Sequence, residues 1–466
     1  MRSPLPPDGD TIVAVSTPAG RGGIGVVRLS GPRAAEIARR LFRQAPGGAP
    51  PDEPGRALFG RLVSARGEPI DQGYLVVFRP PRAYTGEETA ELWAHGSPAV
   101  LRSLVEEAVG AGARPATPGE FTLRAFLTGR IDATRAEAIR DLIEARTAFQ
   151  AKVAHDQVMG RVAAEVDRLK DRLAEIVARV EATIEFSEEV EAGRFAPEGG
   201  FVAAARALRL DLERLAGTYE RGRRVREGAG VAIVGSPNVG KSSLFNRLLE
   251  EERAIVTPIA GTTRDLLEET LDVSGIPITL TDTAGIQEPR DEADAEAVRR
   301  ARAALQAADL LLLVLDWSRP LREDERALLR GAERERAIVV FNKSDLPCGA
   351  SMDEVLFLRR RHGAFEVSAK SGEGIGDLRR RLGEAVGAPT VASRETIFLT
   401  NLRHRDLLLK AAEALRRAEG AAERGTGEEY VVLDLGEGLE RLGEITGEVG
   451  IDGIYDRIFR DFCIGK

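Results

Sequence analysis

The sequence contains very little cysteine and no long apolar run. Cys348 and Cys463 are the only cysteines among 466 residues, which excludes a disulfide framework and a CxxC metal-binding pair. No apolar run approaches the ~20 residues of a membrane span. The start, MRSPLPPDGDTIVAV, lacks the charged-then-apolar pattern of a secretory signal. We therefore expect a cytoplasmic protein without membrane contact.

An excess of positive charge is also missing. The net charge of −8 argues against nucleic-acid binding driven by bulk charge, although a local basic site stays open. The run RGRRVR (221–226) is either such a site for nucleic-acid phosphates or a solvated linker. The four histidines show no metal-ligand spacing; they are His95, His155, His362 and His404.

The chain is too long for one core, and its pattern of helix-like and strand-like segments changes three times. Short β-like runs such as GVVRLS and DQGYLVVF predict an N-terminal α+β domain. Buried-strand runs that alternate with helical segments predict an α/β domain with a mainly parallel sheet. The predicted segments are an N-terminal domain (1–128), a first helical part (129–226), an inserted α/β domain (227–388) and a second helical part (389–466).

The helical parts show apolar residues at spacings of three and four. One such face is formed by Val158, Val162, Val166, Leu169, Leu173, Ile176, Val180 and Ile184. Because a single helix face cannot bury itself, we expect both helical parts to form one domain around the inserted one. Two separate helical bundles are the alternative.

The segment GSPNVGKSS (235–243) is a phosphate-binding loop between a predicted strand and a predicted helix. Gly235 and Gly240 let backbone N–H groups close around phosphates. Lys241 reaches the β- and γ-phosphates, and Ser242 offers its hydroxyl to Mg²⁺. A chance glycine loop is the alternative for this motif taken alone.

Three later segments favour a guanine nucleotide and a Ras-like G domain. DTAG (282–285) ends a strand, so that Asp282 supports Mg²⁺ and the N–H of Gly285 meets the γ-phosphate. NKSD (342–345) follows another strand, and the carboxylate of Asp345 suits two donors that guanine has and adenine lacks. SAK (368–370) closes the base site. The predicted GTP-binding residues are Asn238, Val239, Gly240, Lys241, Ser242, Ser243, Thr257, Pro258, Ile259, Ala260, Gly261, Thr262, Thr263, Asp282, Thr283, Ala284, Gly285, Asn342, Lys343, Asp345, Ser368, Ala369 and Lys370.

Ile286 stands where Ras-like GTPases have a glutamine that orients the attacking water. The segment TPIAGTTRD (257–265) occupies the place of switch I, with Thr263 as the second Mg²⁺ hydroxyl. A monovalent cation can replace an arginine finger, because both put positive charge at the transition state. Its oxygen ligands would come from Asn238, Thr257, Ile259 and Thr262. The alternative is that Asn238 only stabilises its loop.

The chain resembles the tRNA-modification GTPases of the MnmE (TrmE) family over nearly its whole length. The specific segments include DTIVAVSTPAGRGGIGVVRLSG (10–31), PGEFTLRAFLTGRIDATRAEAIRDLI (118–143), LGEITGE (442–448) and FCIGK (462–466). The resemblance implies an N-terminal domain that resembles folate-binding domains, forms a homodimer and binds a formyl-tetrahydrofolate derivative. It implies folate contacts at Arg28, Glu91, Arg130 and Lys466, with Arg130 replacing a family lysine.

The resemblance also implies a potassium ion between the G domains of two subunits. It implies that the family's water-positioning acid falls on Asp294, which is one methylene shorter than the family's glutamate. Lys241, Gly285 and Asp294 are then the catalytic residues. Glu292 and Glu296 are alternatives to Asp294, and a solvated acidic face is another. Cys463 is either a functional thiol in the C-terminal tail or inert.

Together these patterns predict a potassium-activated GTPase that forms GDP and phosphate. By resemblance it acts on tRNA with an FAD-dependent partner, MnmG (GidA), in a heterotetramer-type complex. The product carries a (carboxymethyl)aminomethyl group on C5 of the wobble uridine. A ribosome-assembly GTPase is the alternative, but it gives no reason for the N-terminal domain or the FCIGK tail. A scaffold that uses GTP only as a conformational switch is a second alternative.

Overall fold

The computed structural model describes residues 9–46, 53–185, 201–250, 268–282, 308–331, 337–388 and 397–449, with Ile458, Phe462 and Gly465. Two compact units divide the chain: residues 1–140, 157–208 and 413–466 form unit 1, and residues 141–156 and 209–412 form unit 2. The division falls within four helices: α4 (Ala133–Glu144), α5 (Ala148–Val158), α8 (Phe201–Ala216) and α15 (Leu402–Glu423). The domain boundaries predicted at residues 128, 226 and 388 remain predictions, because this division follows contact density.

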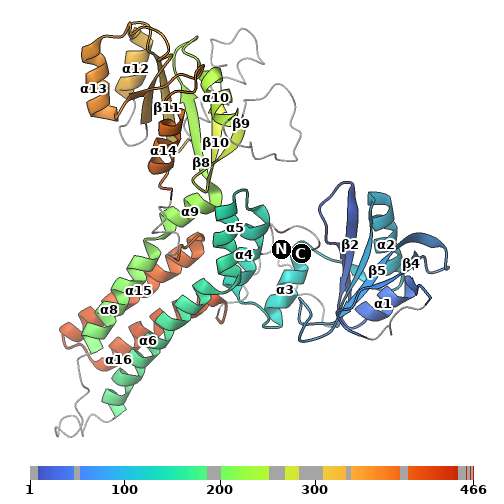
Figure 1. Cartoon of the computed structure of the whole chain (residues 1–466). Helices are drawn as coiled ribbons and strands as arrows, with labels where there is room; N and C mark the ends of the chain where they lie inside the picture. Colours follow the sequence, from blue (N-terminus) through green and yellow to red (C-terminus); the bar gives the residue numbers. More distant parts are fainter. Residues whose placement is uncertain are drawn as a thin grey trace, which may run out of the picture. The chain divides into compact units, whose positions relative to one another are not determined.

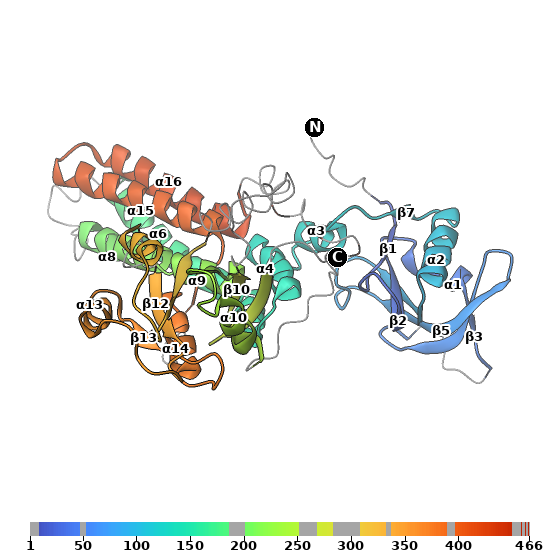
Figure 2. The same ribbon diagram turned by 90° about the horizontal axis from the view of Figure 1, so that it is seen from above.

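The N-terminal part of unit 1 is a seven-stranded sheet with helices on one face. Its order is β3-β4-β5-β6-β2-β1-β7, and only the β1–β7 pair is parallel among those described. Helices α1 (Ala34–Arg40) and α2 (Pro98–Gly110) share one core with the sheet (Figure 2). The strands are β1 (Ile12–Val15), β2 (Gly22–Ser30), β3 (Phe42–Gln44), β4 (Leu58–Val63), β5 (Pro69–Phe78), β6 (Thr89–Gly96) and β7 (Arg114–Pro115). The α+β prediction is confirmed.

Long helices complete unit 1. Helix α6 (Arg161–Glu185) packs beside α16 (Glu428–Thr446) (Figure 1). The predicted apolar face of α6 is buried at Val162, Val166, Leu169, Leu173, Ile176 and Val180. The prediction is wrong at its start, because Val158 ends α5 (Ala148–Val158) and a turn with Gly160 at φ +86° separates the helices. Helices α3 (Glu120–Leu127) and α4 (Ala133–Glu144) precede α5.

Unit 2 contains a doubly wound α/β domain, as predicted. Its sheet has the order β13-β12-β11-β8-β10-β9, and only β9 is antiparallel to its neighbour. Helices α10 and α14 pack on one face and α12 and α13 on the other. The elements are α9 (Tyr219–Glu227), β8 (Ala229–Val234), α10 (Lys241–Glu250), β9 (Glu268–Val273), β10 (Ile276–Asp282), β11 (Leu310–Asp316), α12 (Glu323–Gly331), β12 (Ala337–Asn342), α13 (Met352–His362), β13 (Phe365–Glu366) and α14 (Ile375–Ala385).

Among the helices of the described ranges, none is both long and apolar enough to cross a membrane.

Candidate functional site

The predicted phosphate loop connects β8 to α10 at the carboxyl ends of the parallel strands. Both of its motif glycines are required by close packing. A Cβ atom on Gly235, at φ +156°, would lie 2.3 Å from the carbonyl oxygen of Val314. A Cβ atom on Gly240, at φ +93°, would lie 2.3 Å from Nδ2 of Asn342. The loop therefore has a shape that side chains at these positions would disrupt.

Lys241 points into this loop. Its Nζ donates to the carbonyl oxygens of Gly235 at 2.8 Å and Ser236 at 3.0 Å, and only 8% of the residue is exposed. Burial lowers the pKa of Lys241 below its ordinary value, and the charge of Asp282 opposes that shift. The loop thus holds a desolvated cation, which an anionic phosphate would stabilise.

Ser242 and Asp282 form a pair of oxygen groups beside the loop. The Ser242 hydroxyl donates to Oδ2 of Asp282 at 2.7 Å. Asp282 ends β10, which lies directly beside β8 in the sheet. A hydroxyl and a carboxylate are hard oxygen donors of the kind that Mg²⁺ prefers. The pair fits the predicted magnesium role, although Thr263 lies outside the described residues.

Asn342 connects the predicted base site to the phosphate loop. Its Nδ2 donates to the carbonyl oxygen of Val239 at 2.9 Å, and its Oδ1 accepts the N–H of Ala369 at 3.0 Å. The Ser368 hydroxyl, which is fully buried, donates to Oδ1 of Asp345 at 2.7 Å. Asp345 itself is exposed, so its other carboxylate oxygen is accessible for a ligand. The NKSD and SAK segments are therefore brought together as predicted.

Lys343 braces the loop from the side, and its partner was not found by sequence reasoning. The residue has φ +69°, and its Nζ donates to the carbonyl oxygen of Asn238 at 2.8 Å and to Oδ2 of Asp316 at 2.7 Å. Burial would raise the pKa of Asp316, but hydrogen bonds from Lys343 and Ser318 outweigh it and lower that pKa. Asp316 ends the strand LLLLVLD, and this position was the sequence feature that could have identified it as a site residue.

Arg247 is a second residue that sequence reasoning missed. Its Nε donates to the carbonyl oxygen of Ala369 at 3.2 Å, and its Nη2 donates to that of Lys370 at 3.0 Å. Helix α10 therefore holds the SAK loop as well as the phosphate loop. The role of this arginine depends on a contact between α10 and the loop 368–370, which are distant in sequence. A motif along the chain therefore does not reveal it.

Several predicted residues lie outside the described part of the chain. They are Thr257, Pro258, Ile259, Ala260, Gly261, Thr262, Thr263, Thr283, Ala284, Gly285, Ile286, Glu292, Asp294, Glu296, Cys463 and Lys466. Asn238, the described member of the predicted potassium set, is exposed and has φ +66°. Its cation role therefore stays a prediction.

Two of the predicted folate residues are direct cross-strand partners in unit 1. Arg28 of β2 and Glu91 of β6 face each other, and Nε of Arg28 lies 2.9 Å from Oε1 of Glu91. Trp93 Nε1 donates to the other oxygen of Glu91 at 2.9 Å. The Arg28 guanidinium lies 5.7 Å from the ring centroid of Tyr84 and 5.9 Å from that of Phe121. These three aromatic residues were not predicted to belong to a site.

Arg130 and Gly465 each lie next to a segment that leads to this region. A Cβ atom on Gly86 would lie 3.1 Å from Cγ of Arg130, in the loop that carries Tyr84. Gly465 accepts the Ser16 hydroxyl at 3.0 Å through its carbonyl oxygen. Ser16 follows β1, which pairs with the strand of Arg28. Gly465 thus lies at the end of the strand that pairs with the strand of Arg28, and the folate roles of these residues stay predictions.

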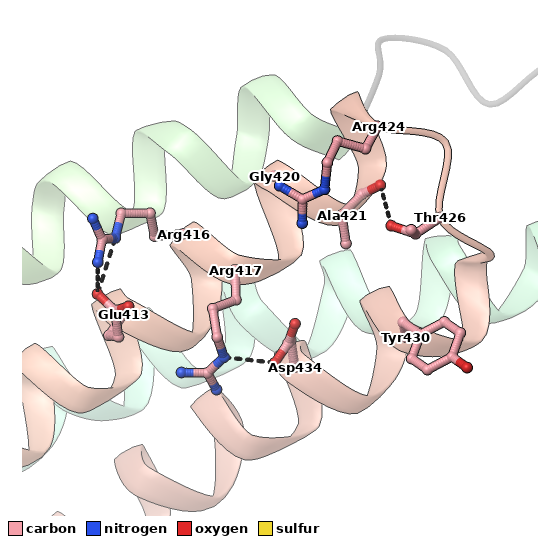
Figure 3. Close-up of a pocket in the computed structure, with 9 residues that line it drawn as sticks. All are labelled: Glu413, Arg416, Arg417, Gly420, Ala421, Arg424, Thr426, Tyr430 and Asp434. Atoms are coloured by element: carbon pink, nitrogen blue, oxygen red, sulfur yellow. Dashed lines mark hydrogen bonds and ion pairs between the residues drawn. The ribbon is translucent and has the colours of Figure 1, made fainter.

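Figure 3 shows a different pocket, of about 500 Å³, between α15 and α16. Its arginines already have carboxylate partners in part: Arg416 binds Glu413, and Arg417 binds Asp434 at 2.8 Å. None of the predicted site residues lines it. We assign no ligand to this pocket, because two of its three arginines are already paired with carboxylates.

Within the described ranges, no three His, Cys, Asp or Glu side chains form a group that would hold a metal ion. Cys348 is exposed, and its thiol lies 3.6 Å from the carbonyl oxygen of Ala350.

Comparison with known proteins covers almost the whole chain. Residues 134–463 match the MnmE helical domain family, and residues 11–130 match the family described as GTP-binding protein TrmE N-terminus. The tRNA modification GTPase MnmE of Geobacter sulfurreducens is 42% identical over 98% of this chain and 99% of its own length. The proteins of the same name from Koribacter versatilis and Aquifex aeolicus are 43% and 41% identical. Each match spans 98% of this chain and at least 99% of the relative.

Proposed function

The chain belongs to the MnmE family of tRNA modification GTPases, and we propose that it binds and hydrolyses GTP in support of tRNA modification. The proposal for GTP rests on one observation above all. The groups that would read a base and those that would hold phosphates form one bonded unit, in which Asn342 bridges Val239 and Ala369.

Guanine would be read by Asp345. The Ser368 hydroxyl fixes one carboxylate oxygen, and the exposed side chain offers acceptors for the N1–H and the exocyclic amine of guanine. Adenine presents no such pair of donors. Asn342 and Lys343 would act through position, because both bond to the phosphate loop.

The phosphates would lie in the loop of residues 235–240, with Lys241 as their charge partner. Mg²⁺ would be held by Ser242 and Thr263, supported by Asp282, and it would neutralise charge on the β- and γ-phosphate oxygens. Lys241 stabilises the charge that develops on those oxygens, and the N–H of Gly285 would bind the γ-phosphate. These roles follow from the family motifs and from the contacts of the described residues.

For hydrolysis, we assign the water-positioning role to Asp294. K⁺ would be held by Asn238, Thr257, Ile259 and Thr262, and it would supply the positive charge that an arginine finger supplies elsewhere. The support for both assignments is the family pattern, together with the alkyl side chain at Ile286, which cannot orient water.

The second ligand would be a formyl-tetrahydrofolate derivative bound by Arg28, Glu91, Arg130 and Lys466. The ion pair of Arg28 with Glu91 and the position of Gly465 beside Ser16 are compatible with this set. A homodimer through the N-terminal domain belongs to the same proposal. Cys463 would then lie in a tail close to the one-carbon site.

The reaction would add a (carboxymethyl)aminomethyl group to C5 of the wobble uridine, with an FAD-dependent partner of the MnmG (GidA) type in a heterotetramer-type complex. The family supports tRNA as the target. In this reaction the nucleotide domain would hydrolyse GTP and the N-terminal domain would bind the folate derivative, so that both domains have a role. A ribosome-assembly role would leave the N-terminal domain unexplained.

Nucleoside analysis of tRNA tests this proposal. Cells that lack the protein should lose the C5-modified wobble uridine, and the parent gene should restore it. Purified protein should hydrolyse GTP much faster than ATP. Unchanged tRNA with altered ribosomal subunit profiles would favour the ribosome-assembly alternative instead.

A further inference from the structure

Helix α5 contacts the nucleotide-binding domain at the turn of the β9–β10 hairpin. Thr147, just before the helix, is 5% exposed, and its hydroxyl donates to the carbonyl oxygen of Gly275 at 2.7 Å. A Cβ atom on Gly275, at φ +96°, would lie 2.6 Å from Cβ of Phe149. Phe149 is itself a member of the core of that domain. The turn is therefore bonded and packed by one end of α5.

The same residues form a capping box at the start of α5. The N–H of Gln150 donates to the Thr147 hydroxyl at 3.1 Å, and the N–H of Thr147 donates to Oε1 of Gln150 at 3.1 Å. A capping box does not use the hydroxyl hydrogen of Thr147 or the side-chain NH₂ group of Gln150. Here the hydroxyl bonds Gly275, and the amide donates to the carbonyl oxygens of Val225 at 2.8 Å and Arg226 at 2.9 Å.

These contacts reach two points that matter for the nucleotide site. Val225 and Arg226 lie near the end of α9, immediately before β8 and the phosphate loop. The hairpin turn, Ser274 at φ +55° and Gly275 at φ +96°, is a two-residue turn that fixes the register of β9 and β10. Strand β10 runs from this turn to Asp282, about 20 Å away at about 3.3 Å per residue.

We propose that Thr147, Phe149 and Gln150, here called the α5 clamp, are positioning residues for GTP hydrolysis. The clamp holds the closed end of the hairpin. The open end carries Asp282 and leads along the chain to the predicted switch I (257–265) and to the segment of Asp294. A rigid two-stranded element transmits a displacement from one end to the other. The clamp therefore sets the geometry of hydrolysis through the hairpin, and this inference rests on the proposed GTPase activity.

The same geometry predicts that loss of the clamp affects the rate of GTP hydrolysis and the affinity for nucleotide differently. The groups that would bind the base and phosphates are on the loops 235–240, 342–345 and 368–370, which bond to one another. None of these bonds passes through the β9–β10 turn. Loss of the clamp should thus lower kcat and leave the Kd for GDP within about twofold of the parent.

The test uses Thr147→Val in the full-length protein. Thr147→Val removes two buried hydrogen bonds, to Gly275 and from the N–H of Gln150. Loss of the bond to Gly275 should accelerate amide exchange in residues 268–282 about three- to tenfold, and we expect kcat to fall by a similar factor. Thr147→Ser keeps the hydroxyl and should behave like the parent. Thr426→Val is the matched control, because it removes a comparable hydroxyl-to-carbonyl bond, of 2.6 Å to Ala421, in the α15–α16 loop.

The outcomes separate this inference from the proposed function. Parent-like exchange and kcat in Thr147→Val, with only a lower melting temperature, would reduce Thr147 to a helix cap and overturn the clamp. If Thr147→Val does not fold, Phe149→Leu tests the same contact with the same two measurements. A parent protein that does not hydrolyse GTP at all would instead contradict the proposed function.

Discussion

The nucleotide site of unit 2 and the Arg28–Glu91 region of unit 1 are built in opposite ways. The nucleotide site consists of short loops at the carboxyl ends of parallel strands, and each loop is one continuous motif. The Arg28–Glu91 region joins residues of two antiparallel strands, a loop and a helix, among them Tyr84 of the loop and Phe121 of α3. The first kind of site can be read from sequence, whereas the second becomes visible only through a family resemblance or a structure.

The largest effect should come from separating the tail from the end of β1. A Cβ atom on Gly465, at φ +100°, would lie 2.0 Å from the carbonyl oxygen of Val15. Gly465→Ala should therefore displace the tail, abolish tRNA modification and leave GTP hydrolysis unchanged, as should removal of residues 463–466. Gly425→Ala is the control, since Gly425 has φ +66° and nothing within 4 Å of its Cβ position.

Modified-uridine content and the rate of phosphate release are the two measurements. Wild-type modification by Gly465→Ala and by the truncated protein would remove the tail from the one-carbon site. Arg28 and Glu91 would then be a partly buried ion pair without a role in ligand binding.

The next effect concerns the acid that replaces the missing glutamine. Asp294→Ala should lower kcat about 10²- to 10⁴-fold, the usual contribution of such groups, and leave GTP affinity little changed. Asp294→Glu should retain or raise activity, because it restores the longer family side chain. If Glu292→Ala or Glu296→Ala loses activity while Asp294→Ala does not, the assignment belongs to that neighbour. Parent-like rates in all three variants would mean that no acid orients the water.

The sequence predicted the fold class because helical and strand periodicities survive without tertiary information. It missed the break between α5 and α6, since Met159 and Gly160 fall inside an unbroken apolar pattern and only the left-handed conformation of Gly160 ends the helix. In the nucleotide site it predicted the loops 235–240, 342–345 and 368–370 but not Asp316 or Arg247, whose partners come from other elements. Spacing along the chain carries no record of such contacts.

The base-reading part of the nucleotide site gives the third prediction. Asp345→Asn replaces an acceptor with an amide that presents donors to the guanine edge. Loss of two hydrogen bonds to a charged group, each about 1.5 kcal/mol at the lower limit, should weaken GTP binding about a hundredfold and favour xanthosine nucleotides. Asp377→Asn, at an exposed carboxylate paired with Arg380 on α14, is the control. Titration with GTP and XTP measures both affinities, and unchanged GTP affinity would refute the guanine assignment.

The smallest effect tests whether a residue outside every motif belongs to the site. Asp316→Asn removes the charge that holds Lys343 and should lower the free energy of unfolding by about 1–3 kcal/mol. Because the pKa of Asp316 is lowered in the folded protein, its contribution should be complete above the ordinary aspartate pKa of about 3.9 and vanish as pH falls through the folded value below it. The stability difference between parent and variant should therefore be constant near pH 7 and shrink below about pH 4.

Asp434→Asn, which breaks the surface pair with Arg417, is the control and should lower the free energy of unfolding by at most about 1 kcal/mol. Denaturant unfolding at several pH values measures both variants, and an Asp316→Asn protein as stable as Asp434→Asn at pH 7 would make the Lys343 brace a surface contact rather than part of the nucleotide site.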